Sequence, residues 1–282
     1  MMKRASFFPN VITAFGLACG LFVIFKTNVI SPHSSDYEIV QTAAFLLLIA
    51  GVADFIDGAL ARAMHAESEF GLVFDSLSDA ISFGVAPSAL MLKALSLEQG
   101  TFLSFFSVTG AIIFSLCGVL RLVRYSVKAK EVQKDVSQEA AHKKYFTGLP
   151  IPAAAGGAVS ANLFLVSPMV VDFFSISTTD RAIALGIVMI LLGYLMVCRL
   201  KFPSLKVLHF RLPSFHLIFL VVVLAIFIIY GILYFFALAL AFVAWAYITT
   251  SLVLSFIRLI AGKKSKTLEE FEPDPEDVDP HS

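Results

Sequence analysis

The sequence predicts an all-α membrane protein, a polytopic helix bundle with about eight transmembrane helices. Hydrophobic residues make up 58% of the 282 residues and the mean hydropathy is +0.86, which is more apolar side chain than one soluble core can bury. A bilayer core about 30 Å thick requires roughly 20 mostly apolar residues per helical span. Eight stretches of about this length occur, near residues 11–30, 39–61, 71–92, 101–122, 151–171, 181–198, 214–230 and 232–257.

The placement of basic residues predicts the orientation of these spans. With eight spans, 18 of the 21 Lys and Arg residues fall on the same side as the N-terminus, and only Lys26, Lys93 and Arg181 fall on the other. Basic loops are retained in the cytoplasm, so both termini are expected there. The first stretch, 11–30, is expected to be a retained span, because it is longer than a signal core and lacks a small-residue cleavage site after it.

The remaining segments are polar. Residues 124–144 contain no apolar run, which predicts a cytoplasmic loop or surface helix facing anionic headgroups. Residues 263–282 combine acidic residues with prolines and predict a charged, disordered cytoplasmic tail, which leaves residues 1–262 as the membrane domain. The three cysteines, Cys19, Cys117 and Cys198, fall inside predicted spans and do not indicate a disulfide framework.

Four aspartates at the edge of the second and third spans are the strongest functional signal. Asp54 and Asp57 are three residues apart, and Asp75 and Asp79 are four apart, so each pair occupies one face of its helix. The short link 63–70 makes the two spans a hairpin, and their acidic faces can meet at the inner membrane surface. Carboxylates in such a place are costly, which indicates a functional site.

The chemistry of the cluster indicates a divalent metal. Four adjacent carboxylates repel one another unless cations compensate them, and an all-oxygen ligand set favours Mg²⁺, Mn²⁺ or Ca²⁺ over zinc. Small residues share the same faces: Gly58, Ala61 and Gly71 either pack helices closely or let a flat ligand approach the backbone. Arg62 either clamps a phosphate or is an ordinary cytoplasmic-side charge.

These residues fill every fixed position of a known signature, DxxDGxxAR followed after eight residues by GxxxDxxxD. The chain therefore resembles the CDP-alcohol phosphatidyltransferase family. The resemblance implies a core of six membrane helices, usually in a homodimer, with the site open to the cytoplasm. The positions that carry the signature are Asp54, Asp57, Gly58, Ala61, Arg62, Gly71, Asp75 and Asp79.

The same resemblance implies roles for individual residues. Asp54, Asp57 and Asp75 would bind two Mg²⁺ or Mn²⁺ ions, and Asp79 would complete the metal site and act as the general base. Contacts to the CDP moiety would come from Gly58, Arg62 and Ser68, with Ala61 and Gly71 beside them. The segment PNVIT resembles the N-terminal element of the family and would place Asn10 and Thr13 near the nucleotide.

Other segments bear on the acceptor alcohol. FDSLSDAISFGVAPS, RLVRY at 121–125 and YFTGLPIPAAAGG at 145–157 resemble the phosphatidylserine synthase branch, as does the eight-span count. This implies transfer of the phosphatidyl group from CDP-diacylglycerol to L-serine, in membrane lipid, without nucleic acid, in a bacterial inner membrane. Arg121 and Arg124, at the cytoplasmic end of the fourth span, would bind the serine carboxylate or a phosphate, or would only set topology.

Alternatives remain open at this point. The acceptor is instead glycerol 3-phosphate or an inositol phosphate if these arginines belong to a larger basic pocket, and an ether-linked lipid donor fits the apolar sequence equally well. In a different class, the aspartates would form the transport site of a cation transporter. Such sites usually lie near the bilayer midplane on broken helices, whereas these aspartates lie at a cytoplasmic edge.

Overall fold

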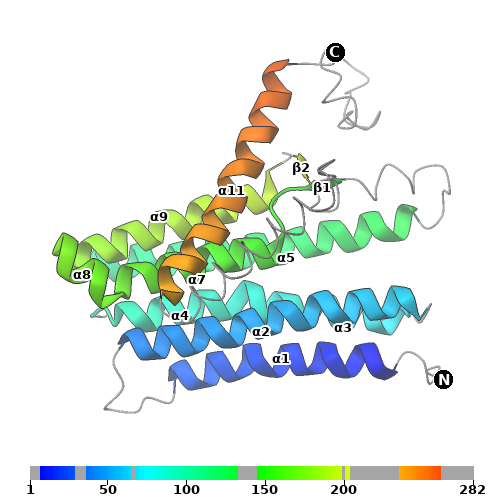
Figure 1. Cartoon of the computed structure of the whole chain (residues 1–282), viewed down its shortest axis with the longest axis horizontal. Helices are drawn as coiled ribbons and strands as arrows, with labels where there is room; N and C mark the ends of the chain where they lie inside the picture. The colour runs from blue at the N-terminus through cyan, green and yellow to red at the C-terminus, as the bar shows by residue number, and fades with distance from the viewer. Residues whose placement is uncertain are drawn as a thin grey trace, which may run out of the picture.

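The structure, a computed structural model, describes residues 7–28, 36–64, 68–98, 100–132, 145–198, 201–203 and 235–261. Apart from one short pair of strands, these residues form helices, which confirms the all-α class. Most of the helices run side by side, and α11 crosses the bundle at a steep angle (Figure 1). The elements in chain order are α1 (Phe7–Asn28), α2 (Asp36–Ala63), α3 (Glu69–Asp79), η2 (Ala80–Val85), α4 (Ala86–Leu95), α5 (Phe102–Val132), β1 (Tyr145–Thr147), α7 (Ile151–Val166), α8 (Pro168–Phe174), α9 (Thr178–Val197), β2 (Lys201–Pro203) and α11 (Phe236–Ala261).

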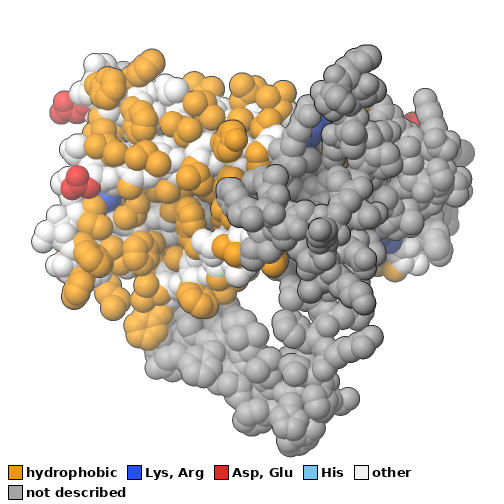
Figure 2. Space-filling view, turned by 90° about the horizontal axis from the view of Figure 1, so that it is seen from above, with side chains coloured by type: hydrophobic (Ala, Val, Ile, Leu, Met, Phe, Trp, Pro, Cys, Tyr) orange, Lys and Arg blue, Asp and Glu red, His pale blue; other side chains and the backbone are white. Residues whose placement is uncertain are grey.

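The long helices identify a multi-pass membrane protein. Five of them, α1, α2, α5, α9 and α11, are long and apolar enough to cross a membrane, and the pair α7 and α8, bent by 60°, adds a sixth if it is one span. The predicted span 71–92 is also helical, because α3, η2 and α4 follow one another without interruption. Hydrophobic side chains cover much of the described surface in Figure 2, as lipid contact requires. The predicted span 214–230 lies outside the described residues, as do 1–6 and the predicted tail 263–282.

Two helix pairs and one central helix organise the packing. Helix α1 packs along α2, α5 packs along α9, and α7 contacts α2, α9 and α11. The N-terminal half of α7 is rich in Ala and Gly, which lets neighbouring helices approach its backbone closely. Phe114, Ile151 and Leu192 are fully buried in the core cluster that joins α5, α7 and α9.

A π-helical segment, η2, begins directly after Asp79. The carbonyl oxygen of Gly84 in this segment accepts a hydrogen bond from the Ser115 hydroxyl of α5 at 2.9 Å. The Ser88 hydroxyl of α4 donates to the Ala111 carbonyl oxygen of α5 at 3.1 Å. The Ser115 side chain thus satisfies a backbone carbonyl of the wider π-helical turn. The apolar periodicity of residues 71–92 carries no signal for this change of helix type.

The chain between α5 and α9 differs from the expectation in detail. The first part of the predicted polar segment 124–144 is helical, since α5 continues to Val132, and residues 133–144 lie outside the described part. Strands β1 and β2, which were not expected, pair antiparallel with Phe146 opposite Phe202. Gly148 follows β1 with a φ of +84°, and a Cβ there would collide with the carbonyl oxygen of Met196. The chain therefore passes tightly against the end of α9, where the Leu149 amide donates to the Leu195 carbonyl oxygen at 3.0 Å.

Candidate active site

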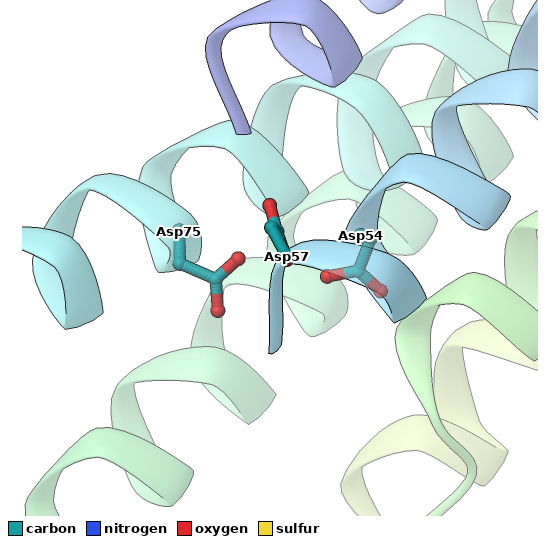
Figure 3. Close-up of side chains that lie close together, drawn as sticks. All are labelled: Asp54, Asp57 and Asp75. Carbon is teal, nitrogen blue, oxygen red and sulfur yellow. The ribbon is translucent and has the colours of Figure 1, made fainter. Parts of the chain in front are cut away.

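Helices α2 and α3 bring three of the predicted aspartates together. One carboxylate oxygen from each of Asp54, Asp57 and Asp75 lies within 4.8 Å of the other two. Figure 3 shows Asp54 and Asp57 on one helix and Asp75 on the other, around a common space. Asp57 is buried, with 3% of its surface exposed, whereas Asp54 and Asp75 are partly exposed.

Asp79 lies beside this cluster of three, one helical turn after Asp75. Its carboxyl group is within hydrogen-bonding reach of Asp54 and interacts electrostatically with Asp57 and Asp75. All four aspartates line one narrow pocket that α1 closes with Thr13 and Gly16. The structure therefore brings together the four carboxylates that the sequence singled out.

The donor set fits a divalent cation. Ligand oxygens on opposite sides of one such ion are about 4 to 5 Å apart, given metal–oxygen distances of about 2.0 to 2.6 Å. The three carboxylate oxygens, within 4.8 Å of one another, match that spacing without a rearrangement of either helix. Close carboxylates also need positive charge to offset their repulsion. The cluster can accordingly hold a metal ion with oxygen ligands.

Helix α1 supports the cluster from behind. The Thr13 hydroxyl, itself buried, donates to Oδ2 of Asp57 at 2.5 Å. In turn, Ser78 and Ser82 donate to the carbonyl oxygens of Thr13 and Gly16, both at 3.4 Å. These contacts tie α1 to α3 and η2 at the level of the acidic residues, and they orient one carboxylate of the candidate metal site.

Residues expected to contact a nucleotide gather at the start of α3. Ser68 is the N-cap of this helix and accepts a hydrogen bond from the Gly71 amide at 3.0 Å. The Asn10 side chain reaches the same place, because its Oδ1 would lie 3.1 Å from a Cβ added to Gly71. Asn10 Nδ2 is buried and has no hydrogen-bond partner among the described residues. A donor left unpaired in this way is available to a ligand.

The end of α2 carries the other predicted contacts. The Arg62 guanidinium lies over Gly58, since its Nη1 would be 3.5 Å from a Cβ added there. Arg62 is exposed and Ala61 is partly buried. The arginine thus follows the same face of α2 as Asp54 and Asp57, as its spacing predicts.

The two arginines of α5 occupy different environments. Arg121 is 8% exposed and interacts electrostatically with Asp79, so it lies next to the acidic pocket. Arg124 turns to the end of α9, where its Nη1 donates to the Val197 carbonyl oxygen at 3.0 Å and its Nη2 to that of Met196 at 3.5 Å. Cations stabilise the carbonyl end of a helix in this manner. Arg121 thus lies beside the aspartates, whereas the guanidinium of Arg124 lies at the end of α9.

Sequence reasoning did not single out three polar residues near the site. Ser78 and Ser82 line the pocket, and their spacing of four residues on the helix of Asp75 and Asp79 was an available signal. Tyr247, on α11, interacts electrostatically with Arg121. It belongs to no motif of the sequence whose spacing connects it to the aspartates.

A bundle of membrane-spanning helices with a carboxylate pocket able to hold a metal ion defines a class, the polytopic membrane proteins with a candidate metal site between their helices. Within it, residues 6–198 match the sequence pattern of the CDP-alcohol phosphatidyltransferase family, and the chain belongs to this family. The match confirms the resemblance drawn from the aspartate signature.

Several curated proteins are similar to this chain. The CDP-diacylglycerol–serine O-phosphatidyltransferase of Helicobacter pylori (strain J99) is 29% identical over 213 residues, covering 75% of this chain and 78% of the relative. The protein of the same name from Bacillus subtilis is 32% identical over 201 residues, covering 71% of this chain and 92% of the relative. The one from Methanocaldococcus jannaschii is 32% identical over 195 residues, covering 65% and 78%.

Proposed function

We propose that this protein transfers the phosphatidyl group of CDP-diacylglycerol to the hydroxyl of L-serine, giving phosphatidylserine and CMP. The observation that carries the proposal is the pocket in which Asp54, Asp57, Asp75 and Asp79 meet beside Arg121. The similarity to bacterial and archaeal proteins named as CDP-diacylglycerol–serine O-phosphatidyltransferases supports serine as the acceptor.

The four aspartates are proposed as ligands of two Mg²⁺ or Mn²⁺ ions. When bound, such ions would neutralise the pyrophosphate and stabilise the charge that develops on the departing CMP. The oxygen spacing of Asp54, Asp57 and Asp75 supports this ligand set. Thr13 holds the Asp57 carboxylate through its hydrogen bond and so keeps it directed into the pocket.

The nucleotide is proposed to lie at the open ends of α2 and α3. Asn10, Ser68 and Gly71 form one wall, where the Asn10 amide offers its unpaired donor. Gly58, Ala61 and Arg62 are proposed to form the opposite wall. Arg62 is exposed over a bare stretch of backbone at Gly58, which suits a guanidinium that pairs with phosphate.

Asp79 is proposed as the general base. The serine hydroxyl oxygen forms a bond to the lipid-side phosphorus, the phosphoanhydride bond to CMP breaks, and the hydroxyl proton passes to the Asp79 carboxylate. Arg121, beside Asp79, is proposed to receive the serine carboxylate and so to hold the hydroxyl near the base. Arg124 is proposed to support this site indirectly, because its guanidinium holds the end of α9.

The setting of the reaction is also a proposal. The distribution of basic residues supports a cytoplasmic site, with both termini in the cytoplasm of a bacterium whose inner membrane contains the protein. A homodimer is proposed from the family resemblance. The membrane domain is proposed to span residues 1–262, followed by a charged cytoplasmic tail at 263–282.

The proposal is tested by CMP release from CDP-diacylglycerol in detergent with Mn²⁺ or Mg²⁺. Serine, glycerol 3-phosphate, an inositol phosphate and no acceptor are compared, using the wild-type protein and Asp79→Asn. We expect release with serine alone and its loss in the variant. If a different alcohol drives CMP release, that alcohol and not serine is the acceptor, and the proposed metal site is unaffected. A folded, metal-binding protein that releases no CMP with any acceptor would overturn the enzymatic proposal.

A further inference from the structure

Helix α11 lies outside the region 6–198 that matches the family, yet it is firmly seated in the bundle. Its Ile248 is 1% exposed and sits against α7 at Gly157, where an added Cβ would lie 2.7 Å from Ile248 Cδ1. Leu192 of α9 lines the same notch, 3.4 Å from that position. Because a side chain at 157 would displace Ile248, the bare backbone there fixes how α11 is rotated against α7.

Tyr247 directly precedes Ile248 on α11, so the same rotation sets the direction of its side chain. Tyr247 is partly buried against the core cluster, and its hydroxyl forms a hydrogen bond with Ser251 one turn further along α11. Ser251 is 2% exposed, so the pair is shielded from the surroundings. A phenol has one donor and can also accept, and after bonding Ser251 it keeps capacity for a second partner. Tyr247 also interacts electrostatically with the Arg121 guanidinium.

The buried guanidinium of Arg121 has a nitrogen without a hydrogen-bond partner among the described residues, which is unusual. Only 8% of the Arg121 surface is exposed, and its Nε is buried without a hydrogen-bond partner among the described residues. Asp79 interacts with it, but Asp79 also belongs to the four-carboxylate pocket. A buried N–H without a partner is costly, and an anionic ligand would both pair it and balance the charge.

We propose that Tyr247 is a specificity-determining residue of the acceptor site, where its hydroxyl and the Arg121 guanidinium together bind the carboxylate of the acceptor amino acid. This inference rests on the proposed function. Serine is short, so the group that binds its carboxylate must lie close to the base that takes its hydroxyl proton. Arg121 meets this requirement beside Asp79, and Tyr247 closes the site from a helix that the family pattern does not include.

The test is the steady-state kinetics of Tyr247→Phe, which removes only the hydroxyl. KM is measured for serine and for CDP-diacylglycerol, and kcat/KM for serine is compared with that for L-serinamide, which lacks the carboxylate. Tyr194→Phe is the matched control, because Tyr194 is 69% exposed on α9. We expect Tyr247→Phe to raise the serine KM about tenfold, as the loss of a hydrogen bond to a charged group implies. The preference for serine over L-serinamide should fall by a similar factor, with the KM for CDP-diacylglycerol within about twofold of wild type.

The following outcomes decide whether Tyr247 belongs to the acceptor site. An unchanged serine KM in Tyr247→Phe, or equal increases for both substrates, overturns the inference. Ser251→Ala controls for misfolding, because it leaves the Tyr247 ring in place. It should raise the serine KM by a smaller factor than Tyr247→Phe. An unchanged serine KM in Ser251→Ala counts against the role of the Tyr247–Ser251 hydrogen bond. If the wild type uses another alcohol, the proposed function fails, and the inference then stands only if Tyr247→Phe raises the KM of an anionic acceptor.

Discussion

Removing the Thr13 hydroxyl is the sharpest test of how α1 supports the candidate metal site. Thr13→Val keeps the shape of the side chain and deletes the 2.5 Å hydrogen bond to Oδ2 of Asp57. Hydrogen bonds to charged groups contribute about 1.5 to 3 kcal/mol, and changes to residues that orient metal ligands typically cost about 10- to 100-fold in metal affinity or activity. We therefore expect the Mn²⁺ concentration for half-maximal CMP release to rise about 10- to 100-fold, because the freed carboxylate no longer faces the pocket.

The assay is CMP release against Mn²⁺ concentration at saturating lipid and serine. Thr109→Val is the matched control. Thr109 is partly buried on α5, and its hydroxyl, like that of Thr13, donates to the carbonyl oxygen four residues earlier, but it has no aspartate partner among the described residues. Thr13→Ser retains a hydroxyl and should recover most of the metal affinity. A half-saturating Mn²⁺ concentration that is the same for Thr13→Val, Thr109→Val and wild type would refute the supporting role of α1.

Three further changes probe the rest of the framework. Asp75→Asn should abolish the rise in unfolding temperature that Mn²⁺ produces, while without metal the variant should be no less stable than wild type, since one repelling charge is gone; a retained metal-induced shift in differential scanning fluorimetry would contradict this ligand. Gly148→Ala should lower the unfolding temperature, because φ is +84° and the new Cβ meets the Met196 carbonyl oxygen, whereas Gly156→Ala, with open space around it, should not; equal effects would count against the tight passage. Arg124→Met should lower the unfolding temperature and leave the serine KM within about twofold, because its guanidinium caps α9; a large rise in serine KM with unchanged stability would instead make Arg124 a substrate ligand.

The aspartate pocket was predictable because helical spacing determines which side chains share a face. Asp54 and Asp57 on one span, and Asp75 and Asp79 on the next, were expected to meet across a short hairpin link, and they do. The π-helical turn after Asp79 was not predictable in the same way. It depends on hydroxyls of Ser88 and Ser115 bridging α4, η2 and α5, and those contacts join residues that lie far apart in sequence.

The roles of single polar residues outside the motif could not be predicted from the sequence, because they also depend on contacts between distant segments. Arg121 and Arg124 are one turn apart and equally basic, so composition and spacing treat them alike. Their separation arises from tertiary packing: the end of α9 offers carbonyl oxygens to Arg124, whereas Arg121 is enclosed beside Asp79. The position of Tyr247 also depends on tertiary packing, because it is set by how Ile248 packs against Gly157.

The side chains of the site do not balance one another's charges, which indicates that the site binds charged ligands. Asp54, Asp57, Asp75 and Asp79 line one pocket, and Arg121 interacts electrostatically with Asp79. One arginine offsets only part of the charge of four ionised carboxylates, which favours a divalent metal ion on the acidic side. Once metal occupies the aspartates, Arg121 is left with less anionic charge to pair with, and its buried Nε then favours an incoming carboxylate. Metal binding and acceptor binding should therefore reinforce each other, so that saturating Mn²⁺ lowers the serine KM in the wild type.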